Sequence, residues 1–441
     1  MAAAAPAARD PRLAGETLER RWPLAAGEAV PRGQGGAPEA GDRGDLLLGG
    51  HDLGEAQVEH TDRLRRRLFQ REDAAVGPQP RACEDRRVPT AVDTLAPLVT
   101  TAFERVPGHL DTATAGLPPR ATLAALHAAL ADWGAGTLDA LGFDADVARC
   151  RAAFAVLAGV PEDSVAIGSQ VSAFAGVVAA SLPAGAQVLC AEGDFTSVLW
   201  PFLVQGRGVT VRTVALEDVP EAIDARTDLV AVSSVMSADG RVADLDALAA
   251  SAAHHGARVF LDATQGCGWQ ELGGARFDYV AVGAYKWLLS PRGTALWAVR
   301  PDALSELVPQ AAGWYAGEHP WESCYGAPLR LATGARRLDV SPAWLCWAGA
   351  APALELLVAC GVPAIAAHDL ALADRLRAGL GEPEPALRGP IVVTQRADAA
   401  QRLAAAGVRA AVRAGRVRLA CHLTTTAADV DRALEALARS A

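Results

Sequence analysis

The chain has 441 residues, and its 41 Lys and Arg against 51 Asp and Glu give a formal net charge of −10. This balance argues against a nucleic-acid-binding protein and a basic membrane-surface protein, because neither phosphates nor anionic lipids would meet a cationic excess. No apolar run reaches the roughly 18 residues of a membrane span, and the first thirty residues lack the apolar segment of a secretory signal. The eight cysteines include no CxxC pair, so we expect no metal site and a reducing, cytoplasmic location.

Residues 1–88 differ in composition from the rest, since they are rich in Ala, Gly, Arg and Pro and contain no clear strand. A short amphipathic piece, residues 59–70, carries the basic run Arg65-Arg66-Arg67. Such a run is compatible with an arm that binds a partner or nucleic acid, but a disordered tail is the simpler interpretation. A mis-assigned start of translation is a third possibility.

Helical patterns follow from about residue 90. Pro118-Pro119 precede an amphipathic stretch with apolar residues at helical spacing, namely Leu123, Leu126, Leu130 and Trp133. A second helical stretch runs from Asp144 to Gly159, and Gly168-Ser169-Gln170 precede an apolar helix over residues 172–182.

Short apolar strands then alternate with helices, as in the helix predicted over residues 244–255. The predicted strands are Gln187–Ala191, Val209–Val214, Leu229–Ser233, Val259–Leu261, Tyr279–Val282 and Ala295–Val299. Several are continuously apolar, which is typical of buried parallel strands. We therefore expect an α/β fold with a mostly parallel sheet and helices on both faces.

Beyond Pro309 the pattern is less regular until a strand at Arg416–Cys421 and a terminal helix at Asp429–Arg439. This change predicts a second, smaller α+β domain. We expect a large domain over residues 110–309 and a small domain built from residues 89–109 and 310–441.

Lys286 is the only lysine, and the chain contains no asparagine. Both residues have A-rich codons, so a GC-rich gene would replace lysine by arginine wherever a positive charge is sufficient. A lysine that survives is a candidate for chemistry that arginine cannot perform, since only lysine readily loses its proton and attacks a carbonyl.

Two polar residues follow neighbouring predicted strands at the same edge of the sheet. Asp262 ends the strand that begins at Val259, and Lys286 follows the next strand, 24 residues later. Ligands of open α/β sheets bind at this edge. The pair suits pyridoxal phosphate, because an amine can bond the cofactor aldehyde while a buried carboxylate keeps the pyridine nitrogen protonated. Gln265 could hydrogen-bond the ring oxygen, and the helix start at Gly168-Ser169-Gln170 offers backbone donors to a phosphate.

These residues resemble the class V aminotransferases of fold type I. The resemblance rests on Asp262-Ala263-Thr264-Gln265, Tyr285-Lys286-Trp287-Leu288 and Pro291-Arg292-Gly293, and it extends over about residues 108–441. It implies a large domain with a mostly parallel seven-stranded sheet and a smaller α+β domain. It also implies pyridoxal 5′-phosphate as cofactor, with Lys286 as the Schiff-base lysine.

The resemblance further implies roles for residues around the cofactor. Asp262 would bind the pyridine nitrogen, Gln265 the phenolic oxygen, and Ser169 and Gln170 the phosphate. Phe195 would stack on the ring, with Thr196 as the alternative under a one-residue shift. We also include Tyr285, the residue before the lysine, among the cofactor-binding residues. Arg418 matches the arginine that holds a substrate carboxylate, and Arg413 could assist it.

Some positions depart from the pattern of relatives. The link Arg413-Ala414-Gly415-Arg416 lacks the catalytic cysteine that desulfurases carry before the last strand, which argues against a persulfide route. Tyr285 replaces the histidine of the desulfurases. Gly283 stands where some relatives place a phosphate-binding serine, and Arg292 could compensate for it. The segment at Gly313 resembles one that reaches the neighbouring subunit's cofactor, which implies a homodimer with shared sites.

We therefore predict an enzyme that acts on a small α-amino acid, with transamination as the first choice. A C–S or β-lyase and an epimerase are alternatives on the same scaffold. A non-catalytic binding or regulatory protein that has retained the fold is the alternative from another class.

Overall fold

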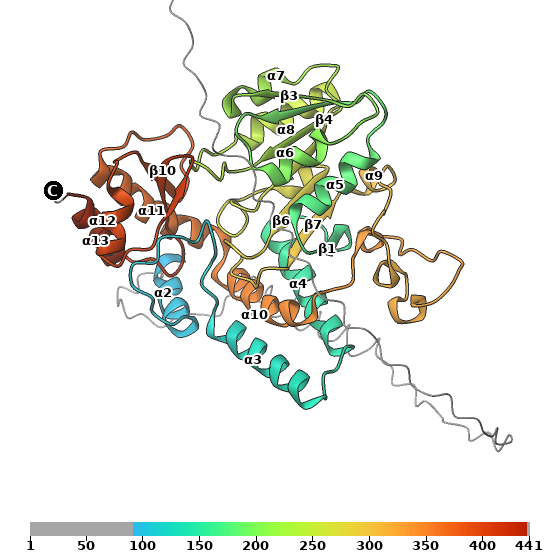
Figure 1. Ribbon diagram of the computed structural model, residues 1–441, viewed down its shortest axis with the longest axis horizontal. Coiled ribbons are helices and arrows are strands. Elements are labelled where there is room, and N and C mark those ends of the chain that lie inside the picture. Colours follow the sequence, from blue (N-terminus) through green and yellow to red (C-terminus); the bar gives the residue numbers. More distant parts are fainter. Residues whose placement is uncertain (1–90, 439–441) are drawn as a thin grey trace, which may run out of the picture. The chain divides into compact units, whose positions relative to one another are not determined.

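The computed structural model describes residues 91–438, with side chains from Leu95 onward (Figure 1). The tail predicted over residues 1–88 lies outside the described residues.

A seven-stranded sheet forms the centre of the protein. Its strands are β1 (Val165–Gly168), β2 (Gln187–Ala191), β3 (Thr210–Val214), β4 (Leu229–Ser233), β5 (Arg258–Asp262), β6 (Tyr279–Gly283) and β7 (Ala295–Val299). The strand order is β1-β7-β6-β5-β4-β2-β3. Only β7 runs against its neighbours, so six of the seven strands point the same way. The predicted α/β class and mostly parallel seven-stranded sheet are confirmed.

Helices cover both faces of this sheet, because alternate strand residues point to opposite sides. On one face lie α5 (Val171–Ser181) and α6 (Thr196–Leu203), which share a core with the strand residues Phe260 and Trp297. The other face packs against α4 (Gly142–Ala158), α8 (Leu245–His255) and α10 (Trp344–Cys360). Continuously apolar strands are thus explained by burial on two sides.

A smaller antiparallel sheet lies near the C-terminus, at the left of Figure 1. It contains β8 (Ile391–Thr394), β9 (Ala411–Arg413) and β10 (Arg416–Ala420) in the order β8-β10-β9. Three helices pack around it: α11 (Val362–Leu380), α12 (Ala399–Ala405) and α13 (Ala427–Ala438). The remaining helices are α2 (Ala91–Ala102), α3 (Arg120–Ala135) and the single-turn α7 (Val219–Ala222) and α9 (Pro301–Leu304).

The helix α10 lies in the stretch that we assigned to the small domain, but its core residues Trp347 and Leu354 are buried with those of the large sheet. The boundary at residues 309 and 310 stays a prediction. Within residues 91–438 no single helix is long and apolar enough to cross a membrane; α10 and α11 pass that test only as a pair, bent by 83°.

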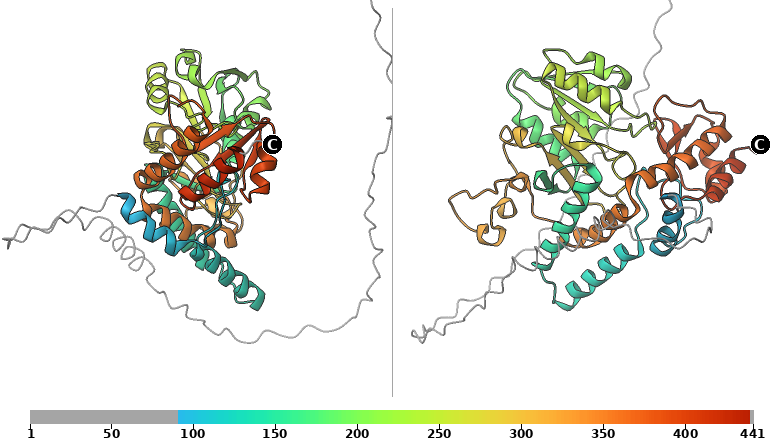
Figure 2. Two further views of the ribbon diagram at one scale, coloured as in Figure 1. Left: turned by 90° about the vertical axis from the view of Figure 1, so that its left-hand side faces the viewer. Right: turned by 180° about the vertical axis from the view of Figure 1, so that it is seen from behind.

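The helix α3 forms where the spacing predicts it, but its apolar residues do not face the core. Leu123, Leu130 and Trp133 are exposed, and Trp133 retains 63% of its surface. The helix lies alongside α10 at the bottom of Figure 1, where Ala129 packs with Ala348, while these three side chains stay outside the contact (Figures 1 and 2). Helical periodicity identifies an apolar face but not what covers it.

Candidate active site

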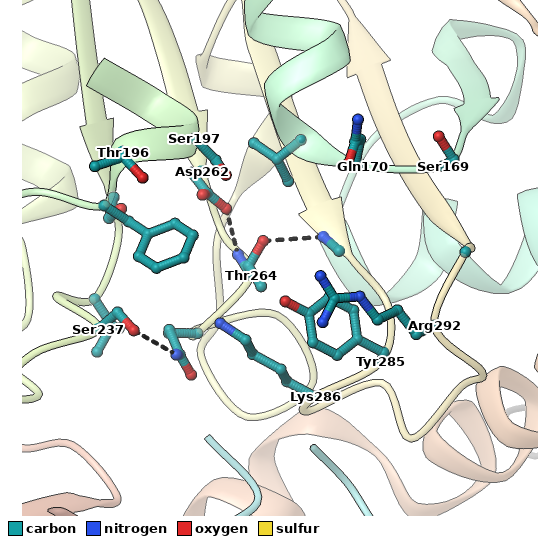
Figure 3. Close-up of a pocket in the computed structure, with 17 residues that line it drawn as sticks. Ser169, Gln170, Thr196, Ser197, Ser237, Asp262, Thr264, Tyr285, Lys286 and Arg292 are labelled. Carbon is teal, nitrogen blue, oxygen red and sulfur yellow. Dashed lines mark hydrogen bonds between the residues drawn. The ribbon is translucent and has the colours of Figure 1, made fainter. Parts of the chain in front are cut away.

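A cavity of about 420 Å³ opens at the carboxyl ends of the parallel strands. The segments that follow β1, β2, β4, β5 and β6 contribute its walls, together with the turn that leads into β7. Seven of the eight predicted site residues line it: Ser169, Gln170, Phe195, Asp262, Gln265, Tyr285 and Lys286. Figure 3 shows most of them around one space. The eighth, Arg418, lies behind this wall, as described below.

Asp262 ends β5 and is buried. Its Oδ1 accepts a hydrogen bond of 2.9 Å from the backbone N–H of Thr264, while the Thr264 hydroxyl accepts one of 2.9 Å from the N–H of Gly283. Thr264 therefore ties the end of β5 to the end of β6. Burial raises the pKa of Asp262, and the hydrogen bonds from Thr264 and the charge of Lys286 oppose that rise.

Lys286 is buried, with 6% of its surface exposed. Burial lowers its pKa to about 8, against the effect of Asp262, and the nearby Arg418, Arg413 and Arg292 lower it further. An amine in this environment is half neutral at about pH 8, so near neutral pH it supplies a far larger share of the neutral form, which a nucleophile or a general base requires, than an ordinary lysine does.

Two aromatic rings flank the lysine. Its Nζ lies 5.4 Å from the ring centroid of Phe195 and 5.6 Å from that of Tyr285. The Arg292 guanidinium lies 5.1 Å from the centroid of the Tyr285 ring. Phe195 is 45% exposed and lines the cavity, so its ring is not packed into the core. Thr196, the alternative to Phe195, also lines the cavity.

The segment Ser169-Gln170 leads from β1 into α5, and Gln170 caps that helix in extended conformation. No side-chain oxygen accepts from the first turn at this cap. The N–H groups of the first turn of a helix have no partner within the helix and attract anions. This end of the cavity is thus suited to a phosphate group.

Gln265 is held by three hydrogen bonds to the protein. Its Nε2 donates to Ala113 O at 3.0 Å and to Ser237 Oγ at 3.2 Å, and its Oε1 accepts from the Trp287 indole at 2.7 Å. The side chain lines the cavity. A hydrogen bond from Gln265 to a cofactor oxygen would have to use one of the two N–H groups of Nε2, which now donate to Ala113 and Ser237.

Arg418 lies on β10 with only 1% of its surface exposed, and it contacts Ser237, which lines the cavity. Its Nη1 donates to the Ser237 carbonyl and hydroxyl, and its Nη2 donates to Thr114 Oγ1 at 2.8 Å. Its Nε is buried without a hydrogen-bond partner. Burial and the neighbouring Arg413 lower its pKa to about 10. An orphaned donor of a buried guanidinium is costly unless an acceptor arrives.

Asp194 belongs to this site, although the sequence pattern did not indicate it. Its carboxylate accepts from the Phe195 N–H at 2.6 Å, from the Ser233 N–H at 2.8 Å and from the Ser233 hydroxyl. Burial is the main cause that raises its pKa to about 6. The residue joins the end of β4 to the segment carrying Phe195, a contact between positions 39 apart that spacing could not reveal.

A buried histidine supports the lysine from the small sheet. His422 follows β10, and its Nε2 lies 3.1 Å from the carbonyl oxygen of Trp287, the residue after Lys286. Its Nδ1 lies 2.7 Å from Asp369 Oδ2, and Asp369 Oδ1 lies 2.8 Å from His368 Nδ1. Both ring nitrogens of His422 therefore lie within hydrogen-bond distance of an oxygen atom. No signal in the sequence indicated this pair.

The turn between β9 and β10 is short. Ala414 and Gly415 both adopt positive φ, at 45° and 74°, as in a two-residue hairpin turn. It carries no cysteine, and the nearest cysteine in sequence, Cys421, is buried with its pKa raised by burial. This geometry agrees with the argument against a persulfide route.

Comparisons with known proteins agree with this site. The family model "Aminotransferase class-V" matches residues 113–410. An uncharacterized aminotransferase, YcbU of Bacillus subtilis (strain 168), is 32% identical over 231 residues, which cover 49% of this chain and 60% of YcbU. A cysteine desulfurase of Dickeya dadantii (strain 3937) is 30% identical over 217 residues, covering 44% of this chain and 49% of the desulfurase. The aligned regions thus span about half the length of these relatives.

Among solved structures, the cystine C–S lyase C-DES has a TM-score of 0.67 at 21% identity, covering 75% of this chain and 96% of the lyase. At this identity the likeness shows the fold, that of fold-type I enzymes. A variant of C-DES is solved with glycine covalently linked to its PLP cofactor. The match to the family model over residues 113–410 is the finding that identifies the chain. The chain belongs to the class V aminotransferase family of pyridoxal-phosphate enzymes.

Proposed function

We propose that the protein is a pyridoxal-phosphate-dependent enzyme that acts on an α-amino acid through Lys286, with transamination as its reaction. The observation that carries this proposal is the pairing of Lys286 with the buried Asp262 at one cavity, where burial lowers the pKa of the lysine to about 8. A solvent-exposed lysine would have an ordinary pKa near 10.5 and would be a poor nucleophile at neutral pH.

The residues around the cavity fit the cofactor. Asp262 uses one oxygen for Thr264 and is available to a protonated ring nitrogen, whose charge would compensate its burial. Ser169 and Gln170 with the first turn of α5 would hold the phosphate. Phe195 would stack on the ring, Gln265 would face the ring oxygen, and Tyr285 would contact the phosphate end. Bound there, the cofactor would serve as an electron sink for the substrate Cα.

The protein's own groups then account for binding and proton transfer. Arg418 would hold the substrate carboxylate through its orphaned Nε and the second N–H of its Nη2, the edge that suits bidentate binding. Lys286, whose pKa burial lowers to about 8, would remove the proton from Cα as a general base and later donate it as a general acid. Ser237 and Thr114 fix Arg418 from the other side.

The alternatives differ in where the proton and the leaving group go. Return of the proton to Cα from the opposite side gives an epimerase, and loss of a β-substituent gives a C–S or β-lyase. A binding protein that has retained the fold would require neither the neutral lysine nor its buried carboxylate partner, which is why we favour an enzyme.

The experiment is an absorption spectrum of the purified protein before and after L-amino acids and cysteine S-conjugates are added, with products identified. One equivalent of 2-oxo acid per enzyme without an acceptor supports transamination. Pyruvate, ammonia and a thiol at many turnovers favour a lyase, and substrate of inverted configuration favours an epimerase. If the protein binds no cofactor, or Lys286→Ala leaves the cofactor spectrum unchanged, the proposal fails and the binding protein takes its place.

We also propose a homodimer in a cytoplasmic location. The dimer is supported by apolar residues that the single chain leaves exposed. They lie on α3 and in the segment between β7 and α10: Leu123, Leu130, Trp133, Tyr325 and Leu329. Large exposed apolar side chains in groups are typical of interfaces. Figure 2 shows that the segment between β7 and α10 projects from the body, as an element that reaches a second subunit would.

A further inference from the structure

Arg413 ends β9, immediately before the two-residue turn into β10. Its Nη2 donates to Thr114 Oγ1 at 3.2 Å, the same hydroxyl that Arg418 Nη2 reaches at 2.8 Å. Two guanidinium groups therefore converge on one oxygen. Arg418 is buried behind Ser237, whereas Arg413 is exposed. The tight turn fixes the backbone that carries Arg413.

The carboxylates around this pair are occupied by other arginines. Asp239 pairs with Arg241 at 3.0 Å and with Arg416 at 3.3 Å. Asp111 lies 3.7 Å from Arg409 and 4.0 Å from Arg418. Among the residues that the structure describes, Arg413 has no carboxylate within 4 Å.

Arg413 also donates from Nη1 to the Val412 carbonyl oxygen at 2.8 Å, and its charge acts on the site. It lowers the pKa of Lys286 and contributes to lowering that of Arg418. Two like charges that share one hydroxyl repel each other unless anions neutralise both. One α-carboxylate on Arg418 would leave the second cation uncompensated.

We infer that Arg413 binds an anionic group on the substrate's side chain, so that the substrate is an amino acid with an acidic side chain. This inference rests on the proposed function, with the α-carboxylate on Arg418. A guanidinium next to the α-carboxylate position is the residue type that recognises a second carboxylate or similar oxyanion.

The test compares two five-carbon carboxylic acids without an amino group, one of which carries a second carboxylate where the other has a methyl group. Isothermal titration calorimetry of the full-length holoenzyme would measure glutarate against valerate. A charge-assisted hydrogen bond predicts that glutarate binds about tenfold tighter. Arg413→Gln is expected to weaken glutarate binding far more than valerate binding and so to abolish this preference. The matched control, Arg432→Gln at an exposed position on α13, is expected to keep the preference.

Equal affinity of the wild type for the two acids would overturn the inference, as would a preference that survives in Arg413→Gln or is lost equally in Arg432→Gln. A failure of the proposed function would look different, since it would show as absent cofactor binding or a spectrum indifferent to Lys286→Ala. As a second readout, kcat/KM for L-glutamate relative to L-glutamine should fall about tenfold in Arg413→Gln.

Discussion

The buried pair His422–Asp369 is the support of the active site that can be tested most directly by mutation. Asp369 is 0% exposed and His422 is 1% exposed. Replacing His422 with leucine removes the 2.7 Å contact with Asp369 and the 3.1 Å contact with the Trp287 carbonyl. It leaves a carboxylate in the protein interior with only the contact to His368.

Removal of the partner of a buried carboxylate typically costs about 3–5 kcal/mol, because the remaining charge is desolvated without compensation. We expect His422→Leu to lower the free energy of unfolding by about 3 kcal/mol or more. His422→Gln can still donate one hydrogen bond and should cost less. The double variant Asp369→Asn/His422→Leu removes the stranded charge and should recover a large part of the loss.

The assay is urea unfolding of the apo-protein, followed by far-UV circular dichroism at 25 °C. Titration of each apo-variant with pyridoxal phosphate would show whether the peptide after Lys286 is still held, and we expect weaker cofactor binding in His422→Leu. The reasoning is refuted if His422→Leu costs less than about 1 kcal/mol, or if the double variant is as unstable as the sum of the single ones.

Three further predictions concern the cavity and the exposed helix. The pKa of Asp194 is raised from an ordinary 3.8 to about 6, so the folded state binds this proton more tightly than the unfolded state does. The protonated carboxyl therefore adds to the free energy of unfolding at low pH, and this contribution is lost as the pH rises from about 4 to about 6. Asp194→Asn should remove this pH dependence, which is worth up to about 3 kcal/mol. Chemical denaturation at pH 4 and pH 6.5 measures it, and the prediction is wrong if the free energies of unfolding at these two pH values differ as much in the variant as in the wild type. Asp262 raises the pKa of Lys286, so Asp262→Asn should lower the pKa of the lysine below about 8. The measurement is the pH midpoint at which pyridoxal attaches to Lys286 of the apo-protein, trapped with borohydride, and this midpoint should move to lower pH. A move to higher pH would show that Asp262 does not raise the pKa of the lysine. Trp133→Glu places a charge on the exposed face of α3 and should reduce the mass in solution from dimer to monomer, as measured by light scattering; a wild type that is already monomeric would rule out the proposed interface.

Much of the large sheet could be predicted because its strands are locally apolar. β2, β4 and β7 match their predicted ranges, and β5 extends one residue beyond the prediction at each end, so that it includes Asp262. β1 was not recognised, since four residues at an edge between two helices carry little pattern of their own. The helix α10 was missed because it is apolar on most sides, which hides helical periodicity. The helix α11 was missed although Pro363 in its first turn and Gly381 at its end are sequence signals of a helix.

The site, too, could be predicted only in part from the sequence. A lone lysine and an acid at the ends of adjacent strands could be placed on one edge from the sequence, and both line the cavity. The roles that we assign to Ser169, Gln170 and Phe195 remain predictions, although all three face that cavity. The position of Arg418 behind Ser237 was not predictable, since it depends on the packing of the small sheet against the segment after β4.

By itself the sequence determined the class of fold, the strand edge that bears the chemistry, and the lysine and acid at its centre. These depend on local apolarity and on the rule that parallel strands end at one edge. Only the tertiary structure decided that Asp194 holds Phe195, that His422 and Asp369 support the lysine, and that Arg413 and Arg418 share one hydroxyl. Such contacts join residues far apart in the chain, and their energies depend on distance and burial, which residue order does not encode locally.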